Sequence, residues 1–224
     1  MEVRFLSFEL GNDTPTFGDN PPVSFQPVSL IENGGIANYF ELKTINHNGT
    51  HVEAPWHFNP GGARLTDFKP EDFVFVRPVL IDVVKTDNEL ITDLDLMPHA
   101  ARLEQADLLL LRTGYGALYR LADPKRYGRR APGFDASAGR YLLQFPELRG
   151  IVMDIPSAGA YAHPETGYEF HRVVMGLGDP DHTMFIVEDA RLDSDLRQTD
   201  LSRIIIAPLL LKAADAAPAT LIAE

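Results

Sequence analysis

The chain has no cysteine among its 224 residues and only one tryptophan. Without thiols, a disulfide framework, a thiolate metal site and a cysteine nucleophile are all excluded. Basic residues are also scarce, because 20 lysines and arginines face 32 aspartates and glutamates, which gives a formal charge of −12. Such an acidic surface disfavours the phosphate backbone of nucleic acids. We therefore expect no nucleic-acid partner.

Long hydrophobic runs are missing as well. The longest, such as residues 204–211, fall far short of the roughly 20 residues that span a bilayer. Residues 1–6 lack the basic flank and apolar segment of a signal peptide. The glycines form neither a dinucleotide fingerprint nor a phosphate loop, and no nucleophile-elbow serine occurs. We expect a cytoplasmic protein that contacts no membrane and uses neither nucleotide nor acyl-serine chemistry.

The apolar pattern predicts one domain over residues 1–224 with interleaved strands and helices, an α/β or α+β arrangement. The content of 45% hydrophobic and 23% charged residues is typical of a globular protein. Strands are predicted at residues 73–84, 107–111, 150–155, 184–187 and 203–211, with Pro78 bending or splitting the first. Helices are predicted at residues 96–105, 137–145 and 170–175. The basic run at residues 120–130 is interpreted as an exposed loop.

Three of the seven histidines fall within eleven residues: His47, His51 and His57. Glu53 lies between them, and all four positions are odd-numbered. Side chains of an extended chain repeat their direction every second residue, so the four groups can face one side of a strand and the following turn. Gly49 and Pro55 oppose a helix, since glycine costs roughly 1 kcal/mol and proline roughly 3 kcal/mol in a helix interior. Residues 40–45 are the predicted strand that delivers this cluster, and imidazole plus carboxylate is the ligand set of zinc or manganese.

The segment from His47 to His57 resembles the H-x-G-T-H-x-D-x-P-x-H signature of the cyclase family, which includes bacterial arylformamidases (kynurenine formamidases) and isatin hydrolases. The likeness continues in the same order along most of the chain. It involves residues 57–62, 111–114, 154–157 and 171–175, the last leading to Glu188. The resemblance implies a cyclase-like fold, with mixed β-sheets and helices packed outside them.

The resemblance also implies roles for individual residues. His57 matches the family's general acid or base, a task suited to imidazole because it titrates near neutral pH. One or two divalent ions, zinc or manganese, would be held by two sets of ligands. These are His47, His51 and Glu53 in the signature, and His171 and Glu188 further along the chain.

Two features depart from the family pattern. The acid of the signature is usually aspartate, and the extra methylene of Glu53 moves its carboxylate outward by about 1.5 Å, so that a bridging geometry can fail and leave one ion. His171 and Glu188 are 17 residues apart, more than is usual, and the extra residues at 178–182 have turn composition. That insertion offers His182 as an alternative ligand. We prefer His171, whose neighbours match the family better, and expect His182 in a solvated loop.

Two further residues are candidates for binding substrate. Trp56 could stack on an aromatic substrate, or it could pack within its own domain or against another subunit. Ser157 follows a predicted buried strand and could hydrogen-bond the substrate, although a structural role in a turn is the alternative.

Together these features favour a metal-dependent hydrolase that cleaves a carbon–nitrogen bond of a small amide with metal-activated water. By resemblance, release of formate from N-formylkynurenine or a similar formanilide is the first expectation, and opening of a cyclic amide such as isatin is the second. A non-catalytic metal-binding or small-molecule-binding protein and a cyclase or lactone hydrolase are the alternatives. We expect a homo-oligomer, a dimer or tetramer, because small enzymes commonly form two-fold pairs.

Overall fold

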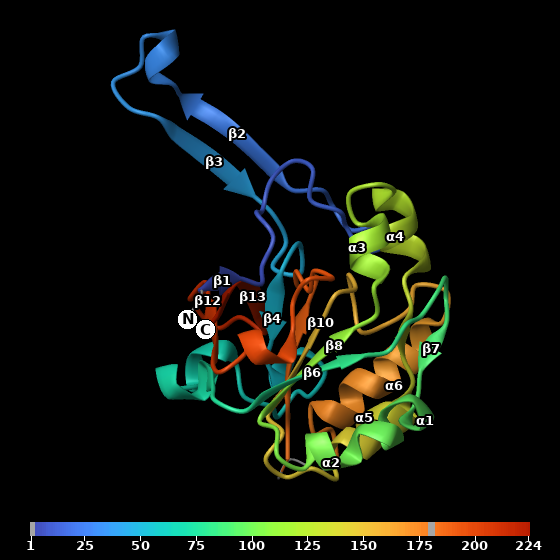
Figure 1. The fold of residues 1–224 in the computed structure, drawn as a ribbon. Coiled ribbons are helices and arrows are strands. Elements are labelled where there is room, and N and C mark those ends of the chain that lie inside the picture. The colour runs from blue at the N-terminus through green and yellow to red at the C-terminus, as the bar shows by residue number, and fades with distance from the viewer. Residues whose placement is uncertain (1–2, 179–181) are drawn as a thin grey trace.

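A nine-stranded mixed β-sheet organises the computed structural model, which describes residues 3–178 and 182–224 (Figure 1). The strand order is β5-β12-β13-β4-β11-β10-β8-β6, and β1 pairs with β13. The strands are β1 (Arg4–Phe5), β4 (His51–Glu53), β5 (Val74–Phe75), β6 (Pro78–Asp82), β8 (Leu108–Arg112), β10 (Gly150–Met153), β11 (Phe185–Glu188), β12 (Ile204–Pro208) and β13 (Ala216–Ala223). The two ends of this order, β5 and β6, are separated by only two residues of chain, so the sheet nearly closes into a barrel.

The sheet is buried on both faces in its parallel half. β6, β8, β10 and β11 run parallel, and the remaining pairs are antiparallel. In β8, Leu109 and Leu111 pack into the core beneath the helices, whereas Leu108 and Leu110 pack into the core on the opposite face. Burial on both sides explains why this strand is a continuous apolar run rather than an alternating one.

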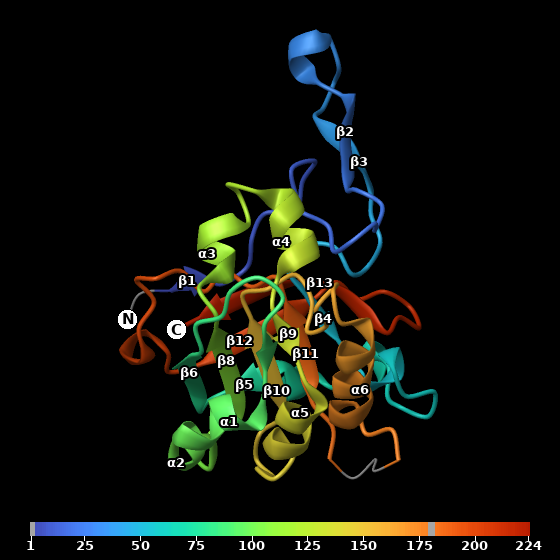
Figure 2. The same cartoon turned by 90° about the vertical axis from the view of Figure 1, so that its right-hand side faces the viewer.

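The helices of the outer layer cover one face of the sheet (Figure 2). They are α1 (Asp93–Leu96), α2 (Ala100–Leu103), α5 (Ala136–Leu142) and α6 (Pro164–Val174), while α3 (Tyr115–Tyr119) and α4 (Pro124–Arg130) lie at one end of the sheet. A short parallel pair is formed by β7 (Leu90–Ile91) and β9 (Gly133–Phe134). Within the described residues, no helix is both long enough and apolar enough to cross a membrane.

Most predicted elements are present, and the mixed α/β class is confirmed. The first predicted strand is split just before Pro78, as expected. The helical segment predicted at residues 96–105 is present in short pieces: α1 ends at Leu96, a 3₁₀ turn covers Met97–His99 around Pro98, and α2 follows. The helix predicted at 170–175 starts earlier, at Pro164, since the fixed φ of proline suits the first turn of a helix.

Two other predictions need correction. The basic run at 120–130 is not an exposed loop: α4 occupies most of it, and Arg120 is buried with its guanidinium 2.7 Å from Asp189. Residues 40–45 do not deliver the histidine cluster on a strand of the main sheet. They belong to β3 (Tyr39–Lys43), which pairs only with β2 (Ser24–Ser29) among the described strands, and the chain turns again before β4.

The hairpin of β2 and β3 projects from the body of the molecule, and Figures 1 and 2 both show it extending well beyond the sheet. A 3₁₀ turn at Ile31–Asn33 begins its tip. We refer to residues 24–43 as the arm. The arm leads directly into the segment that carries His47.

Candidate metal centre

Two strands and one helix bring four side chains to a common centre. His51 and Glu53 are two residues apart on β4 and therefore face the same side. Glu188, the last residue of β11, is the antiparallel register partner of His51. Helix α6 places His171 against the same face, and all four side chains are buried. The centre thus lies at the carboxyl end of a parallel strand, where ligands of α/β sheets commonly bind.

The distances between these side chains are longer than those of ordinary hydrogen bonds and suit metal ligands. The four nitrogen–oxygen separations are 3.3, 3.5, 3.6 and 3.6 Å. Such values exceed the usual hydrogen-bond length of about 2.9 Å. A tetrahedral ion about 2.1 Å from each ligand places neighbouring ligand atoms roughly 3.4 Å apart. Each separation is compatible with two ligands of a divalent ion, and the two histidines face different oxygens of each carboxylate.

The orientation of the two buried histidines supports this interpretation. The Nδ1 of His51 lies 2.8 Å from the carbonyl of Gly49, and the Nδ1 of His171 lies 2.6 Å from the carbonyl of Gly167. A carbonyl only accepts, so Nδ1 carries the proton and Nε2 is directed into the cluster. Among the described residues, His51 Nε2 and Glu53 Oε2 are buried atoms without a hydrogen-bond partner. Buried nitrogen and oxygen atoms that lack a hydrogen-bond partner fit the role of metal ligands.

Glu53 lies between two groups of histidines. Its Oε1 is 2.9 Å from His47 Nδ1, and Oε2 faces His171 Nε2 at 3.5 Å. Two groups that could hold an ion are accordingly His47, His51 and Glu53 on one side, and Glu53, His171 and Glu188 on the other. His47, His57 and Asp215 form a third such group among the described residues. The Glu53 carboxylate therefore belongs to both of the first two groups.

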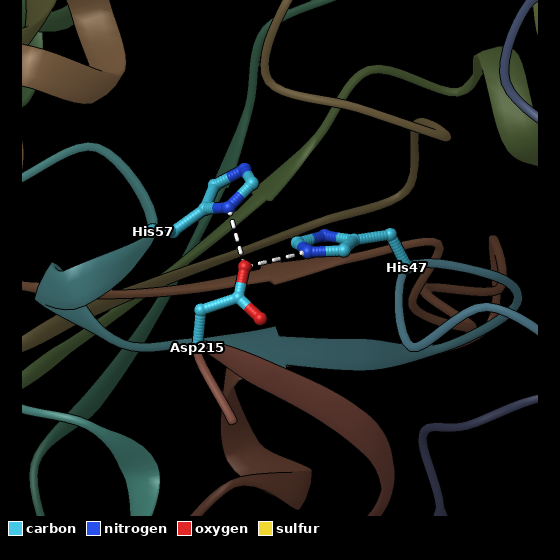
Figure 3. Close-up of side chains that lie close together, drawn as sticks. All are labelled: His47, His57 and Asp215. Atoms are coloured by element: carbon cyan, nitrogen blue, oxygen red, sulfur yellow. Dashed lines mark hydrogen bonds and ion pairs between the residues drawn. The ribbon is translucent and has the colours of Figure 1, made fainter. Parts of the chain in front are cut away.

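A second, more accessible cluster adjoins the buried centre (Figure 3). Asp215 Oδ2 lies 2.7 Å from His57 Nδ1 and 3.1 Å from His47 Nε2. The other oxygen of Asp215 accepts a hydrogen bond of 2.7 Å from Asn46. The side chains of His47, His57 and Asp215 are 20–25% exposed, so this side of the centre is open to solvent.

Asp215 is the site residue that the sequence analysis missed. It immediately precedes β13, which pairs with β4, and this pairing brings it beside the signature histidines. The available signal was an isolated aspartate at the start of an alanine-rich segment. The strand itself was also missed, because alanine has little preference for β-structure.

Burial and ionic contacts shift the pKa values of the buried histidines strongly. Burial alone lowers the pKa of His51, but contacts with Glu188 and Glu53 outweigh it and raise the pKa to about 10. The pKa of His171 is likewise raised to about 10 by the same two carboxylates, against the effect of burial. In the absence of a cation, protons on these imidazoles therefore neutralise the buried carboxylates.

Burial and ionic contacts also shift the pKa values in the accessible cluster. Burial lowers the pKa of His47, yet hydrogen bonds to Asp215 and Glu53 raise it to about 9. Burial raises the pKa of Asp215, but hydrogen bonds from His47 and His57 outweigh it and hold the pKa well below its usual value. Asp215 is consequently ionised throughout the neutral range and can orient the histidines that contact it.

The other predicted site residues lie around the centre. The Ser157 hydroxyl is 3.4 Å from Glu188 Oε1, which also accepts a 2.6 Å hydrogen bond from the backbone of Ala158. Trp56 is half-buried, with the Arg64 guanidinium 4.4 Å from its ring centroid. Its contact with Arg64 favours the packing alternative for this tryptophan.

His182 does not join the centre. Its ring nitrogens lie 3.1 and 2.9 Å from the carbonyl oxygens of Leu143 and Leu148. His182 lies in a loop, as expected, but these contacts hold its ring partly buried rather than fully solvated. The rest of the predicted insertion, residues 179–181, lies outside the described residues.

Comparison with known proteins finds a matching family model, relatives in sequence and solved structures with a similar fold. The family model described as "Putative cyclase" matches residues 5–160. A kynurenine formamidase from Bacillus cereus is 29% identical over 215 residues, which cover 95% of this chain and 92% of the relative. Isatin hydrolase A from Ralstonia solanacearum matches with a TM-score of 0.80 at 21% identity, over 99% of this chain and 91% of that one. A structure described as "Potential Metal-Dependent Hydrolase With Cyclase Activity" matches with a TM-score of 0.71 at 21% identity, over 99% and 96% of the two chains. The solved structures establish the shared fold.

Removing His171 should abolish tight metal binding, whereas removing His182 should not. His171→Ala deletes an imidazole that faces both buried carboxylates, so the affinity for Zn²⁺ should fall by more than about 100-fold. Chelator competition on folded protein, checked by circular dichroism, measures the change. His182→Ala is the matched control, and its affinity should stay within about twofold of wild type. The reverse ranking of the two variants would exclude His171 as a ligand.

Metal binding should release protons at pH 7. Imidazoles with pKa values of about 9 to 10 are protonated at pH 7 in the metal-free protein and must lose those protons to bind the ion. The apparent affinity should consequently increase as the pH rises from 7 toward 10. Titration calorimetry in buffers of different ionisation enthalpy reports the number of protons released. Zero release at pH 7 would contradict the proposed imidazole ligands.

Proposed function

The chain belongs to the cyclase family, and from this premise we propose that it is a metal-dependent hydrolase that cleaves a carbon–nitrogen bond of a small amide, with residues 1–224 acting as one catalytic domain. The supporting observation is the pairing of two sites. A buried cluster with ligand-like spacing adjoins an accessible histidine that is held by a carboxylate. A protein that only stored or bound a metal would not need the second feature.

The residues proposed to hold the metal are His47, His51, Glu53, His171 and Glu188. A bound divalent ion, zinc or manganese, would supply a Lewis acid for hydrolysis of the amide. Glu53 faces both ligand groups, which supports a site with capacity for two ions. Ala158 and Ser157 contact Glu188 and hold its carboxylate in place.

His57 is proposed to transfer the proton. Its Nδ1–H donates to Asp215, so Nε2 is the nitrogen left to take a proton from water. Nε2 points toward the buried centre, 3.5 Å from Glu53 Oε1. After the attack, the same atom can return the proton to the departing nitrogen, as a general base that becomes a general acid. Asp215 fixes the ring orientation and stabilises the imidazolium.

We favour a formyl amide of an aromatic amine as the substrate. Relatives named kynurenine formamidase match almost the whole chain at 28–29% identity. Aromatic rings also flank the site. The ring of Phe58 stacks on that of His171 with centroids 4.6 Å apart, and the ring centroid of the partly exposed Tyr168 lies 6.0 Å from that of Phe58. These rings, more than Trp56, could receive an aryl group. Opening of a cyclic amide such as isatin is the second candidate, supported by the fold shared with isatin hydrolases.

Protein purified without chelators, analysed for metal and then assayed on both substrates, tests the proposal. We expect bound zinc or manganese and metal-stimulated release of formate from N-formylkynurenine. Opening of isatin without release of formate would favour the cyclic amide over the formyl amide as the substrate. Stoichiometric metal without turnover of any amide, lactam or lactone would refute the hydrolase.

Replacing His57 should remove turnover but leave the metal bound. His57→Ala deletes the proton-transfer group but keeps all five proposed metal ligands, so kcat should fall by about 10²–10⁴-fold. Steady-state kinetics and elemental analysis on the same sample measure both quantities. His163→Ala, an exposed histidine elsewhere, is the control and should retain wild-type kcat. Near-normal turnover by His57→Ala would end this assignment.

Asp215→Asn should also slow the reaction. The amide keeps the shape of the carboxylate but loses the charge that stabilises the protonated form of His57, so kcat should fall by on the order of 10²–10⁴-fold. Asp215→Glu should recover part of the rate, because the charge is restored. A KM close to wild type in both variants would indicate that substrate binding is intact. Unchanged kcat in Asp215→Asn would show that Asp215 does not assist His57.

A further inference from the structure

A buried ionic cluster that the proposed reaction does not use lies next to Glu188 in the chain. The carboxylate of Asp189 accepts two hydrogen bonds from the guanidinium of Arg120, one to each oxygen, at 2.7 and 2.8 Å. The hydroxyl of Tyr127 donates to Asp189 Oδ1 over 2.7 Å. All three side chains are buried. We refer to Arg120, Tyr127 and Asp189 as the clamp. Its fork-like pairing of guanidinium and carboxylate fixes orientation as well as charge.

The backbone of Asp189 adopts a conformation that few residues other than glycine occupy. Its φ is 51°, in the left-handed region, where Cβ crowds the backbone. Such a conformation persists only where the surroundings enforce it. Here the N–H donates to the carbonyl of Ile155 over 2.8 Å, and the carbonyl accepts a 2.6 Å hydrogen bond from the hydroxyl of Thr50. Together with the clamp, these contacts engage every polar group of Asp189.

The clamp reaches Asp189 from the helices at the end of the sheet. Arg120 follows α3 directly, and Tyr127 belongs to α4 (Figure 2). Helix α3 packs very closely on the residue after β10, because a Cβ added at Gly116 would lie 2.5 Å from the carbonyl oxygen of Asp154. The ring of Phe8 covers the guanidinium of Arg120, whose central carbon lies 3.7 Å from the ring centroid. A separate group of elements therefore holds the residue that follows Glu188.

The position of Asp189 connects the clamp to the metal centre. Glu188 and His51 are register partners on β11 and β4. The hydrogen bond between Thr50 and Asp189 joins the residue before His51 to the residue after Glu188. The Glu188 carboxylate faces the centre, whereas the Asp189 carboxylate faces the clamp. A change in the backbone at Asp189 would therefore move the end of β11 that carries Glu188.

We propose that Asp189 is a positioning residue for the metal centre: the clamp holds its left-handed backbone, and this backbone directs the carboxylate of Glu188 toward His51 and His171. The inference rests on the proposed function, because it takes Glu188 as a metal ligand. Without the clamp, the end of β11 relaxes toward ordinary strand geometry and Glu188 is held less precisely. Metal affinity then falls although every ligand residue is still present.

Two buried tyrosines provide a matched test. Tyr127→Phe removes the hydroxyl that holds Asp189, whereas Tyr115→Phe removes a hydroxyl that donates over the same 2.7 Å to Asp87, in the loop between β6 and β7. Both rings are buried and keep their packing in the variants. The affinity for Zn²⁺, measured by chelator competition, should fall at least about threefold in Tyr127→Phe. Tyr115→Phe should retain the wild-type affinity, while thermal melts followed by circular dichroism report the stability that each variant loses.

A double-mutant cycle tests whether Asp189 acts through Glu188. Asp189→Ala alone should weaken Zn²⁺ binding by about tenfold or more. In a Glu188→Ala background the same substitution should have little further effect, because the carboxylate that it positions is absent. Asp189→Asn should recover part of the affinity, since asparagine tolerates the left-handed backbone and keeps one acceptor oxygen.

Two results would overturn the inference. One is an equal loss of affinity in the two tyrosine variants, and the other is an additive loss in the cycle; either would leave the clamp a role in stability alone. If Asp189→Ala does not fold, the tyrosine pair decides the question. Tight binding of Zn²⁺ by wild type that Tyr127→Phe fully retains refutes this inference and leaves the hydrolase proposal standing. Wild-type protein that binds no Zn²⁺ refutes both.

Discussion

Two buried carboxylates held side by side are the constraint on which the rest of the structure depends. Glu53 and Glu188 are almost fully buried, and both face His51 and His171. Uncompensated negative charge in such a place would be strongly destabilising. Protons on the imidazoles, or a divalent ion in their place, must supply the compensation. Pairing of β4 with β11 and packing of α6 on the sheet therefore depend on that compensation.

The site combines segments that lie far apart in the chain. The signature contributes His47, His51, Glu53 and His57 within eleven residues, but α6, β11 and the start of β13 contribute the remainder. The two parts of the site differ in how deeply their side chains are buried. Groups at the end of β11 and on α6 are shielded from water and suited to holding an ion, whereas His57 and Asp215 are partly exposed and suited to exchanging protons. The arm ends at Lys43, a short segment before His47.

Sequence reasoning succeeded where the signal was local. The apolar runs of β8, β10 and β11 and the split at Pro78 followed from residue patterns, and the resemblance identified the cyclase family. It failed where distant contacts override local preference. β3 has strand composition but belongs to the arm, and β13 is rich in alanine yet lies within the sheet. Arg120 was interpreted as exposed because neighbouring cations usually are, whereas Asp189 binds it in the interior.

The sequence by itself determined the residue types of the signature, because His51 and Glu53 are two residues apart on one strand and share a face, and His47 and His57 each lie within six residues of both. The tertiary structure decided which distant groups complete the centre. His171 rather than His182 faces Glu53 because α6 packs against β4, and Asp215 meets His57 because β13 pairs with β4. Such placement depends on strand order and on how the helices pack against the sheet. Both arise from contacts summed over the whole core, so they cannot be inferred from a short stretch of residues.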